Sequence, residues 1–190
     1  METHVPTREE ALALLKKYNS DEALINHARA VEAVMRYMAR KMGYEQEEEK
    51  WGVIGLIHDI DYEKYPEQHC TKSEEILREH GWPDDYIRAV ISHGWGICSG
   101  AEPLSELEKT LFAVDELTGL VTACALVRPS RSVRDLEASS VKKKWKQRAF
   151  AAGANREVIQ KGAEMLGIEL MELFSDVIMG MREVSDEIGL

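Results

Sequence analysis

The sequence of 190 residues lacks the cysteine pattern of a disulfide framework. Its 3 cysteines, Cys70, Cys98 and Cys124, are odd in number, scattered along the chain and never spaced as CxxC. An odd, scattered set of this kind argues for reduced thiols. We therefore expect a cytoplasmic protein whose thiols are bystanders.

Long apolar runs, a leader and strand patterns are also missing. No apolar run approaches the roughly 20 residues that a membrane helix needs. The first residues, METHVPTREE, are polar, so we expect no secretory signal. No segment alternates between apolar and polar residues over a strand length, and there is no internal repeat or low-complexity segment. The sequence predicts neither a membrane span nor a sheet.

Charge of one sign is in excess. The formal net charge of −10 disfavours general affinity for nucleic acid or for an anionic membrane. Basic residues nevertheless outnumber acidic ones between Arg128 and Arg148, a stretch that includes Lys142. Two interpretations stay open for it: a solvated helix face, or a local basic surface that meets an anionic substrate.

What is present is an ordinary globular composition with helical periodicity. Apolar residues make up 44% and charged residues 31%, and the length suits one domain with one core. Thr7, Ser20 and Ser105 are expected N-caps, the last in a capping box with Glu108. The pattern predicts an all-α fold with helices over about 7–18, 20–43, 46–58, 71–81, 83–93, 105–128, 139–150, 155–167 and 168–184.

Six polar residues stand at places where a polar side chain is costly. Each lies beside an apolar helix stripe, at the end of an apolar helix, or, for the last one, inside the run LFAVDELTGLV. They are His27, His58, Asp59, His69, His93 and Asp115. One cation shared by several of them would remove the burial penalty of each, so the set indicates a metal site.

Each of these residues also has a simpler explanation. A single histidine on an apolar face is usually a hydrogen-bonded core residue, and a single aspartate within a helix usually belongs to a local network. Two further histidines are left out of the predicted site: His4 lies near the terminus, and His80 at a helix C-terminus favours the helix dipole.

The order of the six residues resembles that of the HD superfamily of metal-dependent phosphohydrolases. His27, the doublet His58-Asp59 after an apolar helix, and Asp115 in a later helix follow the order H…HD…D. The segments HCTKSEEIL (69–77) and AVISHG (89–94) resemble those that carry the additional histidines of the two-metal members. The wider chain is similar to a group of small bacterial HD proteins that are predicted hydrolases.

The resemblance implies an HD-type helical bundle with two metal ions and a metal-activated water. His27, His58, Asp59 and Asp115 would hold one ion, and Asp59, His69 and His93 the other, with Asp59 bridging. Ligand atoms that are all nitrogen or oxygen suit Fe, Mn, Zn, Co or Ni. We expect residues 1–190 to form a single domain, with the HD core at 20–126 and a helical extension at 127–190 packed on it.

One departure from the family pattern concerns the substrate. Many members continue HDxGK, whereas this chain reads His58-Asp59-Ile60-Asp61-Tyr62, so the lysine that often contacts phosphate is absent there. Lys64, Arg128 and Lys142 are the candidates to replace it. Asp61, with Glu63, is a candidate to orient water or protonate a leaving group. Trp95, in the glycine-rich loop, either stacks on a substrate base or simply packs.

The expected activity is hydrolysis of a small phosphate ester, a nucleotide being one candidate. Two other classes stay open: an HD-type oxygenase that uses the same ligands for two irons, and a non-catalytic module that binds a nucleotide or a partner. The expected partner is a small phosphorylated molecule, with no nucleic acid and no membrane. The last helix carries one apolar side, formed by Leu173, Val177, Ile178, Met181 and Val184, which fits either packing within the chain or a dimer seam.

Overall fold

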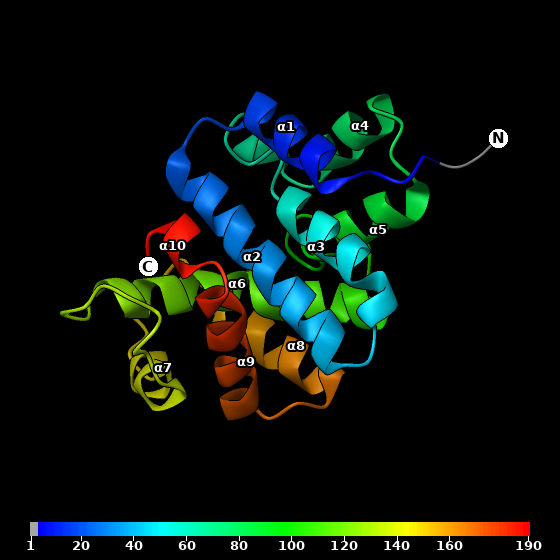
Figure 1. Ribbon diagram of the computed structural model, residues 1–190. Coiled ribbons are helices and arrows are strands. Elements are labelled where there is room, and N and C mark those ends of the chain that lie inside the picture. The colour runs from blue at the N-terminus through cyan, green and yellow to red at the C-terminus, as the bar shows by residue number, and fades with distance from the viewer. Residues whose placement is uncertain (1–3) are drawn as a thin grey trace.

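The computed structural model describes residues 4–190, and every extended regular element in that range is a helix (Figure 1). The predicted all-α fold is therefore confirmed. The α-helices are α1 (Arg8–Tyr18), α2 (Glu22–Lys41), α3 (Glu48–Ile57), α4 (Thr71–Glu79), α5 (Asp84–Ser92), α6 (Glu106–Leu126), α7 (Ala138–Trp145), α8 (Arg156–Leu166), α9 (Leu170–Arg182) and α10 (Ser185–Ile188). Two 3-10 turns, η1 (Glu45–Glu47) and η2 (Pro66–Gln68), lie between them.

Two of the three predicted N-caps are confirmed, and one is wrong. Thr7 and Ser105 both form capping boxes, as the sequence predicts for Ser105 with Glu108. Helix α2 is capped by Asp21, whose side chain accepts a hydrogen bond from the amide of Ala23, and not by Ser20. Ser20 is unavailable as a cap because its amide and its hydroxyl both donate to the carboxylate of Glu63, 2.7 Å away in each case.

The largest error in the predicted helix boundaries lies in the basic segment. The helix expected over 139–150 ends at Trp145, and turns follow as far as the N-cap of α8, Asn155. The guanidinium of Arg156 donates to the carbonyls of these turns. In a continued helix the same carbonyls would accept from backbone amides and would not be available to Arg156. The expected helix over 46–58 likewise starts with the turn η1, and the last helix ends at Arg182 with α10 following as a separate turn.

Helix α2 runs through the centre of the fold and packs against α3, α6 and α9 (Figure 1). Helix α3 is buried along its whole apolar run from Trp51 to Ile57. Gly55 permits the close approach of α3 to α2, since a Cβ there would lie 2.9 Å from the side chain of Met35 and 3.1 Å from the carbonyl oxygen of Val31. This crossing fixes the C-terminal end of α3, where the His58-Asp59 doublet begins.

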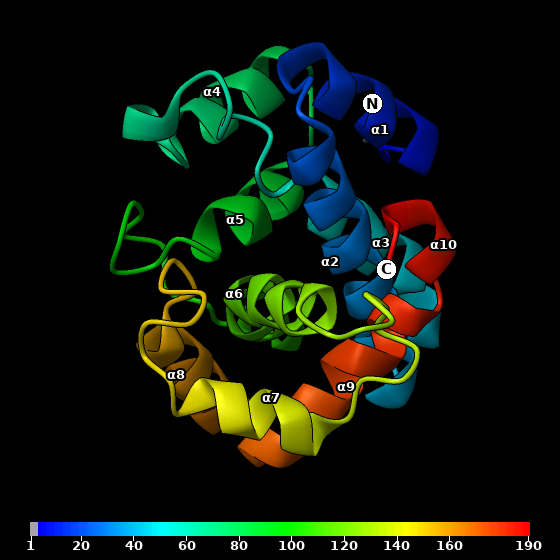
Figure 2. The same ribbon diagram turned by 90° about the vertical axis from the view of Figure 1, so that its left-hand side faces the viewer.

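The C-terminal helices complete the same core. Figure 2 shows α6 between α5 on one side and α7, α8 and α9 on the other. Gly162 of α8 lies so close to α6 that a Cβ would come within 2.5 Å of the Cα of Ala113. The apolar side of the last helix is buried within this chain at Leu173, Val177, Ile178 and Met181. Among the described residues, no helix is both long and apolar enough to span a membrane.

Candidate metal centre

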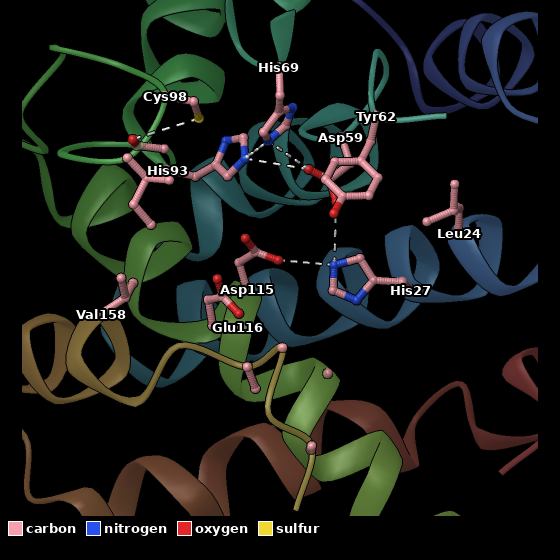
Figure 3. A pocket seen from close by; sticks show the side chains of 16 residues that line it. Leu24, His27, Asp59, Tyr62, His69, His93, Cys98, Asp115, Glu116 and Val158 are labelled. Carbon is pink, nitrogen blue, oxygen red and sulfur yellow. Dashed lines mark hydrogen bonds and ion pairs between the residues drawn. The ribbon is translucent and has the colours of Figure 1, made fainter. Parts of the chain in front are cut away.

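Five separate parts of the fold bring the six predicted ligands together. Five of the six line one cavity (Figure 3), and the fully buried His58 lies behind that lining, beside Asp59 and Asp115. His27 lies on α2, and His58 with Asp59 follows the last turn of α3. His69 stands between η2 and α4, His93 ends α5, and Asp115 lies in the middle of α6. Apart from His58 and Asp59, no two of the six residues are adjacent in sequence. Their proximity is therefore a result of the tertiary structure.

The first half of the site contains two imidazoles and two carboxylates. The Nε2 atoms of His27 and His58 lie 2.9 and 3.2 Å from Oδ1 of Asp115. The same two nitrogen atoms lie 3.7 and 3.2 Å from Oδ2 of Asp59. One donor atom from each of the four residues falls within 4.8 Å of all the others, which is a separation that a single metal ion spans.

The second half of the site uses the other oxygen of Asp59. Oδ1 of Asp59 lies 3.5 Å from Nε2 of His69 and 3.4 Å from Nε2 of His93. These two nitrogens are 3.0 Å apart. The two oxygens of one carboxylate are thus divided between two groups of imidazoles, as a bridging ligand requires.

The hydrogen bonds behind the imidazoles determine which atoms face the cavity. Nδ1 of His58 lies 2.8 Å from the carbonyl oxygen of Gly55, and Nδ1 of His93 lies 2.5 Å from that of Val90. Nδ1 of His69 lies 2.7 Å from Oδ1 of Asp61. Since these oxygens accept, each Nδ1 donates, and Nε2 of each ring offers a lone pair to a metal ion once it has lost its proton.

This arrangement of atoms fits divalent cations. The lone pairs of His69 and His93 face each other at 3.0 Å with no proton to share when both rings are neutral. A cation between lone pairs and carboxylates would relieve that repulsion. The nitrogen and oxygen donors match the metals expected from the sequence.

The electrostatics of the site are dominated by buried opposite charges. Burial alone would lower the pKa of His58, but the charges of Asp59 and Asp115 outweigh it and raise that pKa well above its ordinary value. Burial alone would raise the pKa of Asp59 and of Asp115, but the charge of His58 and hydrogen bonds from the histidines hold both below their usual range. Burial alone would also lower the pKa of His69, but its hydrogen bond to Asp61 and the charges of Asp59 and Asp61 together raise that pKa.

The other residues predicted for the site lie elsewhere. Asp61 is fully buried, and its two oxygens accept from Nδ1 of His69 and from the amide of Ser73, 2.7 and 2.8 Å away. Lys64 turns outward, donating to the carbonyl of Lys17 at 2.8 Å with its ammonium 4.9 Å from the ring centre of Tyr18. Neither side chain belongs to the lining of the cavity.

The predicted substrate contacts are also outside that lining. Arg128 pairs with Asp135 at 2.9 Å, and Lys142 is exposed on α7. The ring of Trp95 lies 5.9 Å from that of Phe112, and the ammonium of Lys161 lies 3.6 Å from its centre. The structure therefore gives Trp95 packing partners within the chain.

The cavity has a volume of about 470 Å³. Besides the predicted ligands, its lining includes residues for which the sequence predicted no role. Tyr62, at its rim, places its ring 5.2 Å from that of His69. Glu116 follows Asp115 on α6 and accepts a hydrogen bond from the amide of Asn155 at 3.0 Å. Burial and the charge of Asp115 raise the pKa of Glu116. Its position beside a predicted ligand was the only sequence signal for it.

One wall of the cavity comes from the C-terminal part of the chain. Ala151, Gly153, Ala154 and Val158 contribute to it. The buried side chain of Arg156 holds this wall by donating to five backbone carbonyls at 2.6 to 3.4 Å, those of Trp145, Gln147, Phe150, Ala151 and Ala154.

The thiol of Cys98 borders the same cavity, and the buried thiol of Cys70 lies against it. The Sγ atoms of Cys70 and Cys98 lie 2.7 Å apart, and all three cysteines are free. Gly94 accommodates this contact, because a Cβ there would lie 2.3 and 2.4 Å from the two sulfur atoms.

A comparison with protein families matches residues 24–120 to the HD domain. The match covers about half of the chain and contains all six residues of the site. No solved structure matches the chain.

Proposed function

Because this chain belongs to the HD domain family, we propose that it is a metal-dependent phosphohydrolase acting on a small phosphate ester. The observation that supports the proposal most is the position of Asp59, whose two oxygens face two separate groups of imidazoles. His27, His58, Asp59 and Asp115 would hold one ion, and Asp59, His69 and His93 a second. Two such ions supply a water of lowered pKa and positive charge for the phosphate oxygens.

The residues of the chain prepare the site for this chemistry. The carbonyls of Gly55 and Val90 and the carboxylate of Asp61 each fix one imidazole with its Nε2 toward the cavity. In this proposal Asp61 acts through His69 and is a positioning residue. Lys64 has no part in it, since its ammonium is held at the carbonyl of Lys17.

The test is a metal-loading and substrate screen. The protein is purified without chelator, its metal content is measured, and it is loaded with Mn, Fe, Co or Ni. Phosphomonoesters, phosphodiesters and dinucleotides are then assayed for phosphate release. His58→Ala and Asp59→Ala should each lose at least about 100-fold in activity, whereas His80→Ala, which removes an exposed histidine outside the cluster, should not.

Two results would favour the two other functions considered for this chain, an oxygenase and a non-catalytic binding module, over the proposed one. Oxygen uptake that depends on substrate, with a mixed-valent di-iron signal and no phosphate release, would indicate an oxygenase. Tight binding of a nucleotide without turnover under every metal would indicate a binding module. Hydrolysis that survives both substitutions would reject the mechanism itself.

A further inference from the structure

We propose that the cavity selects phosphate monoesters whose organic group carries a hydrogen-bond donor, best a protonated amine, and no second negative charge. Glu116 accepts the hydrogen bond from this donor. The inference rests on the proposed function, since it assumes that the phosphate group lies at the six ligands. It assigns a role in substrate selection to a residue outside them.

The first argument is the geometry of Glu116. The residue lies on α6 directly after Asp115, and its side chain lines the same cavity (Figure 3). Its Oε2 accepts a hydrogen bond from the amide of Asn155 at 3.0 Å. That bond accounts for one oxygen. Within residues 4–190, Oε1 has no hydrogen-bonding partner, so a half-buried acceptor is left for a molecule in the cavity.

The second argument is the charge of the lining. Among the described residues that line the cavity there are three carboxylates, Asp59, Asp115 and Glu116, and neither lysine nor arginine. Of the basic side chains nearest in sequence to the wall, Arg156 donates to five carbonyls and Lys161 lies over the ring of Trp95, while Arg148 is exposed and does not belong to the lining. A second anionic group on the substrate would meet Glu116 without a compensating cation, which disfavours nucleoside triphosphates and phosphorylated acids.

The third argument is the apolar character of the remaining wall. Leu24, Ile97, Ala151, Ala154 and Val158 surround the space above the ligands. Such walls exclude water and strengthen a hydrogen bond between a carboxylate and a charged donor. A small organic group that ends in an amine would fill the apolar space and reach Glu116 at its edge.

The experiment compares three small phosphomonoesters of similar length that differ in terminal charge: O-phosphoethanolamine, n-propyl phosphate and 2-phosphoglycolate. With metal-loaded wild-type protein we expect kcat/KM to fall in that order. Glu116→Gln, which keeps an acceptor for the amide of Asn155, should reduce the ratio of amine to carboxylate substrate about 10- to 100-fold. Glu116→Lys should invert the preference. Glu164→Gln, the same change at an exposed position of α8, should leave the ratio as it is.

Binding provides a second readout that does not require turnover. Calorimetric titration of the metal-loaded protein should show tighter binding of O-phosphoethanolamine than of 2-phosphoglycolate, and Glu116→Gln should remove the difference. Equal kcat/KM for the three esters, or a ratio unchanged by Glu116→Gln, would overturn this inference and leave the phosphohydrolase proposal intact. Failure of all three esters and of p-nitrophenyl phosphate under every metal would overturn both.

Discussion

Asp61 holds the ring of His69 through a hydrogen bond of 2.7 Å between Oδ1 and Nδ1, while its other oxygen accepts from the amide of Ser73. His69 and Ser73 both donate to Asp61. An asparagine at this position offers only one oxygen as acceptor, so its amide nitrogen, itself a donor, would face one of these two donors. We expect Asp61→Asn to lower metal affinity in the half formed by His69 and His93 about 10- to 100-fold.

Metal titration with stoichiometry measures this effect. Asp84→Asn, the same change at an exposed residue of α5, serves as the control. Equal affinities of Asp61→Asn and wild type for both ions would show that the bond between Asp61 and His69 does not contribute to binding.

The stability of the metal-free protein should depend on pH in a direction set by His58. Its pKa in the folded chain is raised well above the ordinary value because Asp59 and Asp115 outweigh burial. A raised pKa means that this contribution to stability is fully present below about pH 6.5, the value in the unfolded chain. It is lost as the pH rises through the folded-state pKa. Thermal unfolding in the presence of chelator should therefore show a falling Tm above about pH 6.5.

Metal binding should show the opposite dependence. A histidine must lose its proton to bind a metal, so the stabilisation by added Mn²⁺ should grow as the pH rises.

The carboxylates of Asp59 and Asp115 have depressed pKa values, so their contribution to the stability of the metal-free protein should be lost only in acid, below about pH 4, as they become protonated. A metal-free Tm that rises between pH 6.5 and 9 would contradict the assignment of a charged His58.

Removal of the Arg156 guanidinium should destabilise the wall of the cavity. Arg156→Ala leaves five backbone carbonyls without their donor, and we expect a loss of about 3 kcal/mol in the free energy of unfolding. Urea unfolding gives this value, and amide exchange should increase within residues 146–155. Arg156→Lys restores part of the loss, since lysine brings a charge and three donors without the fork geometry. Metal content should remain that of wild type, because the ligands lie on other segments.

Two glycines of the α6–α8 region should respond to alanine in opposite directions. A Cβ at Gly162 would lie 2.5 Å from the Cα of Ala113, so Gly162→Ala forces α8 away from α6 and should cost about 1 to 3 kcal/mol. A Cβ at Gly119, inside α6, would meet nothing within 4 Å. Gly119→Ala should stabilise the helix by about 0.5 to 1 kcal/mol. Denaturant midpoints of the two variants check the signs, and a stable Gly162→Ala would mean that the two helices are free to separate.

Much of the fold follows from the sequence because its signals are local. The capping boxes at Thr7 and Ser105 depend on residues three positions apart, and both are formed. The sequence does not predict that Ser20 is lost as an N-cap, because its partner, Glu63, is distant in sequence. The end of α7 was misplaced for the same reason, since Arg156 binds the carbonyls that follow it.

The candidate site, too, has features that the sequence predicts and features that depend on contacts distant in sequence. The six candidate ligands could be selected from the sequence because polar residues in apolar helices need an explanation, and their order resembles that of the HD family. The direction of Lys64 was not predictable, since the carbonyl of Lys17 and the ring of Tyr18 determine it. The place of Glu116 in the cavity, on which its proposed role rests, depends on residues 151–158 folding over α6, which no local pattern indicates.

The segment that Arg156 anchors lies outside residues 24–120, the part matched to the HD domain. A fragment that stopped at the end of α6 would retain every imidazole and carboxylate of the cluster but would leave them open to bulk solvent on that flank. The candidate ligands and Glu116 thus come from one stretch of the polypeptide, and the wall that faces them comes from another. Substitutions at Ala151, Gly153, Ala154 and Val158, with Arg156 kept, should therefore change which molecules fit the cavity without altering the candidate ligands.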